Sequence, residues 1–187
     1  METEKVRCAW CTKTENMRQY HDTEWGVPVH DDRKHFEFIV LDSFQAGLSW
    51  QTILNRRDGF RKAFADFDPV AVAKFSKDQV EQLMLDEGII RNRLKIAGTV
   101  KNAIAFLKIQ AEYGSFDAYI WQFTGHAVLD RKPQSLSDIP ASSPESDAMS
   151  KALKKHGFTF VGTTICYAYM QAAGMVNDHV NGCWRRG

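Results

Sequence analysis

Residues 86–93 read Asp-Glu-Gly-Ile-Ile-Arg-Asn-Arg, a glycine turn between two stretches of helical character. Before the turn, Ser76 to Gln79 has the sequence of a helix capping box and precedes apolar residues at helical spacing. After it, apolar side chains recur on one helical face from Ile96 to Leu107 and stop near Gly114. The pattern predicts a helix, a tight turn and a second helix.

The same turn is a candidate contact with a nucleic-acid backbone. A glycine turn that leads into a helix can present backbone amides to phosphate, and nearby cations neutralise the phosphate charge. The candidate DNA-binding residues here are Gly88, Ile89, Arg91, Arg93 and Lys95. The alternative is an ordinary turn between two helices, because glycine is common at helix ends.

Helical patterns account for most of the remaining chain. The expected helices cover residues 31–45, 117–123, 143–157 and 163–174, with a further short one after Asp68-Pro69. Only the run Phe-Thr-Phe-Val at 158–161 resembles a strand, and one such run cannot form a sheet. The predicted fold class is therefore all-α.

A loop-like stretch over residues 125–144, rich in proline, serine and aspartate, is the one candidate domain boundary. It predicts a helical domain over 30–130 that contains the glycine turn, and a linker over 131–139. A second helical unit would combine residues 1–29 with residues 140–187.

The composition suits one compact domain or two small ones, with 187 residues of which 44% are hydrophobic. No apolar stretch approaches the roughly 20 residues that a membrane-spanning helix needs, and the first residues lack the apolar core of a signal peptide. We expect a soluble, cytoplasmic protein with no membrane partner. The net charge of +1 leaves room for a local basic face.

Each end of the chain carries one cysteine and one histidine at spacings typical of metal ligands: Cys8 with His21, and His179 with Cys183. A closed tetrahedral zinc site takes four such ligands, and a site of this kind would join the two chain ends. Two alternatives stay open. Cys8 can instead pair with Cys11, or the four residues can be unrelated buried side chains.

Aromatic residues accompany a carboxylate near the sequence Gln-Ala-Gly-Leu-Ser-Trp at 45–50. The carboxylate belongs to Asp42, and the candidate base-pocket aromatics are Trp10, Tyr20, Trp25, Trp50 and Tyr167. Aromatic planes can enclose a base that has left the duplex, and a carboxylate can accept hydrogen bonds from the amine of adenine. The alternative for each ring by itself is packing in the core.

Six blocks of sequence carry a resemblance to a known family. They are RCAW at 7–10, YHDTEWGVP at 20–28, QAGLSW at 45–50, GIIRNR at 88–93, GFTFVGTTICY at 157–167 and VNDHVNGC at 176–183. On these blocks the sequence resembles the bacterial 3-methyladenine DNA glycosylases I, members of the helix-hairpin-helix glycosylase superfamily. The resemblance implies base-excision repair, in which the N-glycosidic bond of 3-methyladenine is hydrolysed in alkylated duplex DNA to leave an abasic site.

The resemblance also implies roles for individual residues. A structural zinc ion would be bound by Cys8, His21, His179 and Cys183, with Cys11 outside the set. Trp50 would stack on the flipped adenine while Trp10 and Tyr20 enclose it, and Asp42, the candidate catalytic residue, would hydrogen-bond its edge. Gly47 and Leu48 would lie near the void left in the duplex, where an apolar Leu48 can replace lost stacking.

Two positions depart from the family pattern. The family carries glutamate where this chain has Asp42, so the carboxylate stands on a shorter stem, and a misplacement of about 1 Å can be costly to catalysis. Met17 stands where relatives carry an aromatic residue. Both departures fall on the predicted pocket.

The expected enzyme is monofunctional. The family lacks the catalytic aspartate of its superfamily, and residues 96–111 contain no acidic side chain. Lys95 is interpreted as a phosphate contact and not as a Schiff-base lysine. We expect a monomer that acts on alkylated double-stranded DNA. The alternatives are a non-catalytic zinc-stapled helix-hairpin-helix protein that binds DNA or damage, and a thiol redox protein that uses Cys8 and Cys11.

Overall fold

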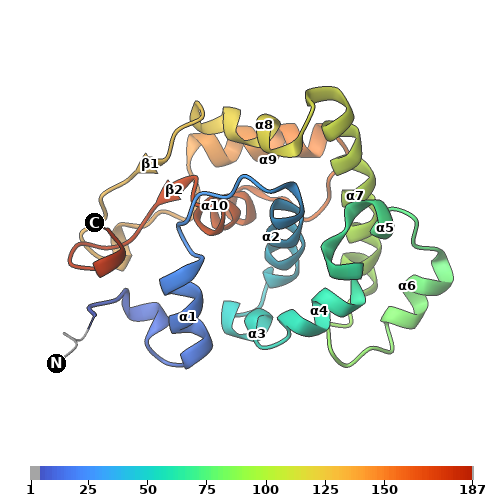
Figure 1. Ribbon diagram of the computed structural model, residues 1–187, viewed down its shortest axis with the longest axis horizontal. Helices are drawn as coiled ribbons and strands as arrows, with labels where there is room; N and C mark the ends of the chain where they lie inside the picture. Colours follow the sequence, from blue (N-terminus) through green and yellow to red (C-terminus); the bar gives the residue numbers. More distant parts are fainter. Residues whose placement is uncertain (1–4, 187) are drawn as a thin grey trace.

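The computed structural model describes residues 5–186, and helices make up nearly all of its regular structure (Figure 1). The α-helices are α1 Glu15–Thr23, α2 Asp32–Gln45, α3 Trp50–Leu54, α4 Arg57–Ala63, α5 Pro69–Val72, α6 Lys77–Leu83, α7 Arg93–Tyr113, α8 Phe116–Ile120, α9 Pro144–Lys155 and α10 Thr163–Ala172. Short 3-10 turns are η1 Ala9–Cys11, η2 Ala65–Phe67, η3 Trp121–Thr124, η4 Leu136–Asp138 and η5 Trp184–Arg186. The all-α prediction is confirmed.

Local capping residues fix several helix starts where the sequence predicted them. Ser76 and Gln79 form a reciprocal capping box at α6, and Ser143 accepts the backbone N–H of Ser146 at α9. Asp68 accepts the N–H of Val70 before Pro69 opens α5. Each cap satisfies helix amides that would otherwise lack a partner.

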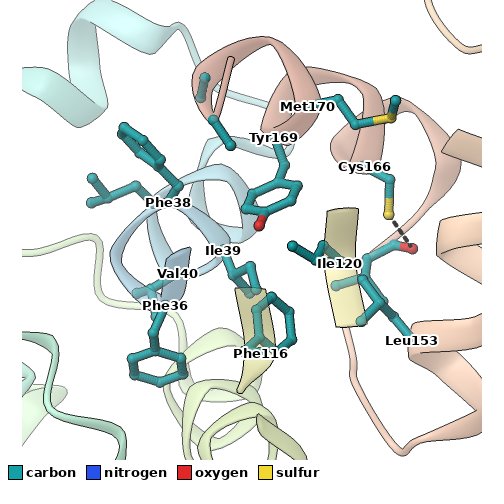
Figure 2. Packing of buried hydrophobic residues seen from close by; sticks show 14 of the residues in the cluster. Phe36, Phe38, Ile39, Val40, Phe116, Ile120, Leu153, Cys166, Tyr169 and Met170 are labelled. Atoms are coloured by element: carbon teal, nitrogen blue, oxygen red, sulfur yellow. Dashed lines mark hydrogen bonds between the residues drawn. The ribbon is translucent and has the colours of Figure 1, made fainter. Parts of the chain in front are cut away.

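Helix α2 is the centre of the molecule, with α7, α8 and α10 packed around it (Figures 1 and 2). Every residue from His35 to Phe44 is buried, so all sides of the helix are covered and not only the one stripe that the periodicity predicted. Phe36 packs edge-on against Phe106 of α7, with ring centroids 5.3 Å apart. The last turn of α2 therefore carries Asp42 deep into the interior.

The run at 158–161, whose sequence resembles a strand, is not a strand in the structure. The two strands of the described chain are β1 Leu129–Asp130 and β2 Val176–Asn177, which pair in parallel. The side chain of Asn102 instead satisfies the backbone of Thr159, accepting from its N–H at 2.8 Å and donating to its carbonyl oxygen at 3.0 Å. Ser150 donates to the carbonyl oxygen of Val161. With side chains as partners, this backbone needs no neighbouring strand.

The turn between α6 and α7 packs directly on α4. A Cβ atom on Gly59 of α4 would lie 2.1 Å from the carbonyl oxygen of Gly88, so only glycine permits this approach. The N–H of Gly88 donates to the carboxylate of Asp86 at 2.7 Å, and Ile89 is buried beneath the turn. The helix, turn and helix predicted over residues 76–114 are present.

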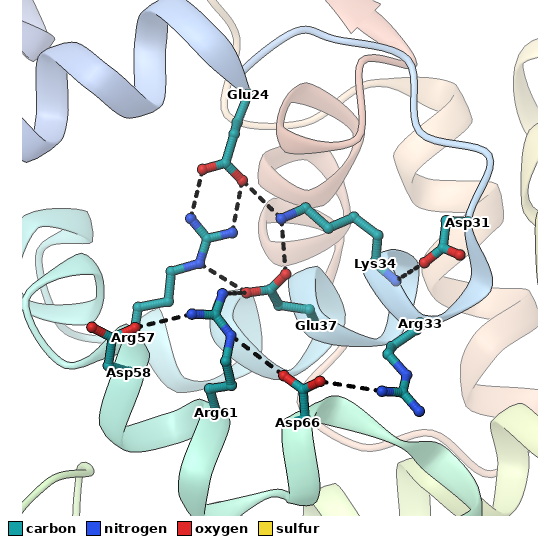
Figure 3. Close-up of polar contacts among 9 residues, drawn as sticks. All are labelled: Glu24, Asp31, Arg33, Lys34, Glu37, Arg57, Asp58, Arg61 and Asp66. Carbon is teal, nitrogen blue, oxygen red and sulfur yellow. Dashed lines mark hydrogen bonds and ion pairs between the residues drawn. The ribbon is translucent and has the colours of Figure 1, made fainter.

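A partly buried ion network joins α1, α2 and α4 (Figure 3). The guanidinium of Arg57 donates to both carboxylate oxygens of Glu24 at 2.7 Å and to Glu37 at 2.8 Å. Lys34 donates to the same two carboxylates. These cations hold the pKa of Glu24 down at about 2 and also lower that of Glu37, against the effect of burial. The network fixes the end of α1 against the body of the protein.

The amino-terminal and carboxyl-terminal segments lie together. The backbone N–H of Trp184 donates to the carbonyl oxygen of Val6 at 2.9 Å. The segment at 131–139, predicted as a linker, contacts the carboxyl-terminal segment through the N–H of Asn181 and the carbonyl oxygen of Pro133. Among residues 5–186, none of the helices combines the length and the apolar character that crossing a bilayer requires.

Candidate active site

A cavity of about 280 Å³ opens where α1, α2, α3 and α10 meet. Its wall contains four of the five predicted pocket aromatics together with Asp42. The lining residues are Trp10, Met17, Tyr20, Trp25, Asp42, Gln45, Trp50, Ile139, Ala168 and Gln171. The structure thus brings together residues that lie more than 150 positions apart in the sequence.

Two helix ends set the positions of the central pair. Asp42 stands on the last turn of α2, which the N-cap Asp31 starts by accepting the N–H of Lys34. Trp50 is the first residue of α3, whose N-cap Ser49 accepts the N–H of Thr52. The chain between these helices, residues 46–49, is exposed to solvent. The carboxylate and the indole therefore face the cavity from rigid elements.

Asp42 is buried without compensation. Only 2% of the residue is exposed, and its Oδ2 atom has no hydrogen-bond partner among residues 5–186. Burial alone raises the pKa of this carboxyl well above its ordinary value. An unpaired buried carboxyl is costly to the folded state, so its presence in a cavity wall indicates a ligand-binding role.

Aromatic rings form the sides of the cavity. The rings of Tyr20 and Trp50 lie 5.2 Å apart and those of Trp10 and Trp25 lie 5.0 Å apart. The indole Nε1 of Trp50 is buried and, within the described part of the chain, takes part in no hydrogen bond. A flat ligand with polar edges can stack on these faces and meet the unpaired groups.

Cys8, His21, His179 and Cys183 form a buried cluster behind the cavity. Their candidate ligand atoms all lie within 4.8 Å of one another. Cys183 Sγ lies 3.4 Å from His21 Nε2 and 3.5 Å from His179 Nδ1, and Cys8 Sγ lies 3.9 Å from the latter atom. Tetrahedral zinc, with bonds of about 2.3 Å to sulfur and 2.0 Å to nitrogen, places these atoms about 3.6 Å apart. The donor set fits zinc.

The outer nitrogens of both histidines have acceptors. His21 Nδ1 lies 2.8 Å from the Asp22 carboxylate, and His179 Nε2 lies 3.3 Å from the carbonyl oxygen of Trp25. Histidines that bind metal commonly donate their second ring N–H in this manner. Arg7 holds Asp22 in turn at 2.7 Å.

Two tryptophans connect the cluster with the cavity. The ring of Trp25 packs edge-on against that of His179 at 4.6 Å, and Trp10 packs edge-on against His21 at 5.4 Å. Cys11 lies outside the cluster, with its thiol donating to the carbonyl oxygen of Cys8. The structure therefore groups Cys8 with His21, His179 and Cys183, and not with Cys11.

Two predicted site residues have other surroundings than expected. Tyr167 is not part of the cavity wall, because its hydroxyl points to the buried Asp178 and donates to it at 2.8 Å. Lys95 is also buried, and its Nζ donates to the carbonyl oxygens of Phe44 and Ala46 at 2.9 and 2.8 Å. Lys95 thus closes the carboxyl end of α2 and does not extend toward a phosphate.

Of the remaining candidate DNA-binding residues, Ile89 is buried, and the others lie at the surface near the turn or beside the cavity. Arg91 and Arg93 are exposed and pair with Glu87 and Glu81, respectively. Leu48 is 39% exposed beside Gly47, whose φ of +83° favours glycine. These exposed positions leave the side chains accessible to a large partner.

Sequence reasoning missed part of the cavity wall. The sequence assigns Gln45 no role of its own and marks Met17 only as a departure from the family pattern. The predicted pocket also leaves out Ile139, Ala168 and Gln171. The spacing of Ala168 and Gln171 on one helical face was an available signal, whereas Ile139 lies in a stretch with no periodic pattern.

The fold and the cavity define a helical protein that can enclose a flat ligand, and comparison with known proteins agrees. A family model described as methyladenine glycosylase matches residues 10–186. DNA-3-methyladenine glycosylase 1 of Escherichia coli (strain K12) is 50% identical over 177 residues, which cover 95% of each chain. The chain belongs to the methyladenine glycosylase family.

Solved structures are similar along nearly the whole chain. A crystal structure of 3-methyladenine DNA glycosylase I has a TM-score of 0.93 and 47% identity, covering 96% of this chain and 98% of that one. A Staphylococcus aureus 3-methyladenine DNA glycosylase I, described for its recognition of 3-methyladenine, has a TM-score of 0.94 and 33% identity, covering 97% and 96%.

Proposed function

We propose that this protein excises 3-methyladenine from alkylated duplex DNA by hydrolysing its N-glycosidic bond. The observation that carries the proposal is Asp42, a buried carboxyl with an unpaired oxygen in the wall of an aromatic cavity. The names of the relatives support the same substrate. Asp42 would accept a hydrogen bond from the base while Trp50 and Tyr20 pack against its faces.

The substrate supplies much of the activation. Methylation at N3 gives the base a positive charge, which ring faces attract by about 0.5–2 kcal/mol. When the bond from C1′ to the base breaks, its electron pair neutralises the base, and positive charge builds on the sugar. The oxygen of water then bonds to C1′ and loses a proton. The pocket residues select, orient and enclose the base in these steps.

Among residues 5–186, no lysine lines the cavity that could cleave the DNA strand through a Schiff base. Lys95 uses its Nζ within the fold, and the one acidic residue of α7, Glu112, lies near the end of that helix. We therefore propose a monofunctional glycosylase. Because one chain supplies the whole cavity wall, we expect a monomer, working where the cell holds its DNA.

For DNA binding, we propose that the turn between α6 and α7 contacts the backbone as a helix-hairpin-helix motif, with Arg91 and Arg93 as its cations. Leu48 is positioned as the wedge, since its exposed side chain stands beside the cavity and can fill the gap that a flipped base leaves.

We further propose that the cluster of Cys8, His21, His179 and Cys183 binds one structural zinc ion. Bound there, zinc would supply cross-linking of the two chain ends, because four protein ligands leave no position for a reacting water. Trp10 and Trp25 touch both the cluster and the cavity, so a cross-link at the cluster would also hold these two rings in the cavity wall.

The decisive experiment measures free 3-methyladenine released from methylated duplex DNA. The wild type should release it, and Asp42→Asn should be slower by about 10- to 150-fold. An amide can still accept a hydrogen bond, but it cannot supply the negative charge that the carboxyl offers a cationic base once it ionises, and hydrogen bonds to charged groups are worth about 1.5–3 kcal/mol. Asp78→Asn, at an exposed carboxylate on α6, is the matched control. A wild type that binds methylated DNA without releasing the base would support the non-catalytic alternative.

A further inference from the structure

Gln171 of α10 is a polar side chain of the cavity wall whose amide is held in place by a hydrogen bond. Its Nε2 donates to Oδ2 of Asp178 at 2.8 Å. The hydroxyl of Tyr167 donates to the same oxygen, also at 2.8 Å, and Asp178 is 1% exposed. The pocket side chain is therefore anchored from behind by two residues outside the cavity wall.

The hydrogen bond to Asp178 determines which way the amide of Gln171 faces. A carboxylate accepts hydrogen bonds and donates none, so the edge of the amide that meets Asp178 must be the NH₂ group. A glutamine free to rotate could present either edge to a ligand. Here the carbonyl oxygen Oε1 is left facing away from Asp178, and it accepts no hydrogen bond from residues 5–186.

We infer that Gln171 determines base specificity, with its Oε1 accepting one N–H of the exocyclic amine of 3-methyladenine. This inference rests on the proposed function. Asp42, in the same cavity wall, is the acceptor for the second N–H of that amine. Asp178 and Tyr167 are positioning residues, because they act on the base only through the orientation of Gln171.

Two acceptors in fixed positions distinguish purines by the exocyclic group, which is an amine in adenine and an oxygen in guanine. The amine of adenine has two N–H donors and satisfies both acceptors. A guanine in the same orientation presents the acceptor O6 and leaves both unpaired, and a purine without the amine offers them nothing. Sites built to hydrogen-bond a group reject analogues that lack it, since buried polar atoms then lose their partners.

The test compares free-base binding, followed by quenching of tryptophan fluorescence, for 3-methyladenine and for 3-methylpurine, which lacks the amine. The wild type should prefer 3-methyladenine. Gln171→Met keeps a similar length without the acceptor, and it should reduce that preference by about three- to tenfold, the effect of one hydrogen bond. Binding of 3-methylpurine should change little.

The positioning role has its own matched pair. Tyr167→Phe removes the hydroxyl that holds Asp178, and it should reduce the preference for 3-methyladenine by about twofold or more. Tyr169→Phe removes the same atom from a buried tyrosine of α10 that bonds to His35, and it should leave the preference unchanged. This pair also tests the inference should Gln171→Met fail to fold.

The outcomes distinguish failure of the proposed function from failure of the role of Gln171. A wild type that neither binds nor releases 3-methyladenine contradicts the proposed function. A wild type that prefers 3-methyladenine, with the same preference in a folded Gln171→Met, overturns the role of Gln171 alone. Equal preferences in Tyr167→Phe and Tyr169→Phe overturn the positioning by Asp178 and Tyr167, and with it the fixed orientation of Gln171 on which the inference depends.

Discussion

Gly59 and Gly88 touch backbone to backbone, with the position of a Cβ on Gly59 only 2.1 Å from the carbonyl oxygen of Gly88. The contact seats the turn between α6 and α7 on α4. Because the obstructing atoms belong to the backbone, no change of side-chain rotamer can relieve a clash there. The orientation of the proposed DNA-binding turn thus depends on a residue nearly thirty positions earlier.

Gly59→Ala should therefore destabilise the protein by about 1–3 kcal/mol, the usual cost of forcing extra atoms into a packed site. It should also weaken binding to undamaged duplex DNA, because the turn moves. Urea unfolding and DNA titration measure the two effects. Gly162→Ala is the control, since nothing lies within 4 Å of its Cβ position. Equal stability of the two variants would contradict the tight contact.

Substitutions at Lys95 and Arg91 should have different effects, the first on stability and the second on DNA binding. Lys95→Met removes two hydrogen bonds to the end of α2 and should cost about 1–3 kcal/mol of stability, with the salt dependence of DNA affinity unchanged. Arg91→Ala should leave stability nearly unchanged and lower the slope of log affinity against log salt by about 1. If Lys95→Met also lowers the slope of log affinity against log salt, Lys95 does contact a phosphate.

The helix starts were predictable because their causes are local. Asp68 before Pro69 and the capping box at Ser76 act on amides two or three residues away, and a sequence displays such neighbours directly. The run at 158–161 resembles a strand in sequence but is not one in the structure, because the partners of its backbone are not local. Its backbone is satisfied by Asn102 and Ser150, which tertiary packing alone brings close.

The residues of the candidate site also divide into those that a sequence pattern reveals and those whose role depends on tertiary packing. Recognisable blocks of sequence contain Trp50 and the four cluster residues, and Asp42 lies three residues before one of these blocks. Tyr167 lies in such a block too, but the helix turns it toward Asp178, and no pattern in the sequence shows that direction. Gln171 escaped notice because its role depends on the same buried aspartate.

The ion network at Glu24 predicts loss of stability in acid. The pKa of Glu24 is lowered to about 2 from an ordinary 4.5, so its contribution is complete above pH 4.5 and disappears as the pH falls toward 2. Arg57→Met should cost about 1–3 kcal/mol at neutral pH, less than the 3–5 of a fully buried pair because Lys34 remains.

Urea unfolding of wild type and Arg57→Met between pH 3 and 7 tests this. The two should become more alike as the pH falls, since protonated carboxyls no longer need the guanidinium. Arg18→Met, which breaks an exposed pair with Glu15, should change stability by less than about 1 kcal/mol at any pH. A gap between wild type and Arg57→Met that stays constant down to pH 3 would rule out the network as its source.

The proposed zinc site predicts different results for two neighbouring cysteines. Cys183→Ser should abolish stoichiometric zinc, measured by atomic absorption, and lower the melting temperature. Cys11→Ser should keep one zinc per chain, because that thiol lies outside the cluster. Chelation of the wild type should weaken folding and 3-methyladenine binding together, since Trp10 and Trp25 contact both sites. Zinc retained by Cys183→Ser would contradict the assignment.

Asp42 should make the protein less stable as the pH rises. Burial raises the pKa of its carboxyl in the folded state, so the folded protein keeps a proton that the unfolded chain releases. Between the ordinary carboxyl pKa of about 3.9 and the raised one, the wild type should lose up to about 1.4 kcal/mol per pH unit relative to Asp42→Asn, which cannot ionise. Urea unfolding of both proteins from pH 5 to 8 measures the difference. A difference that does not change with pH would show that Asp42 titrates normally, and its selection as the base-binding carboxyl would lose its physical support.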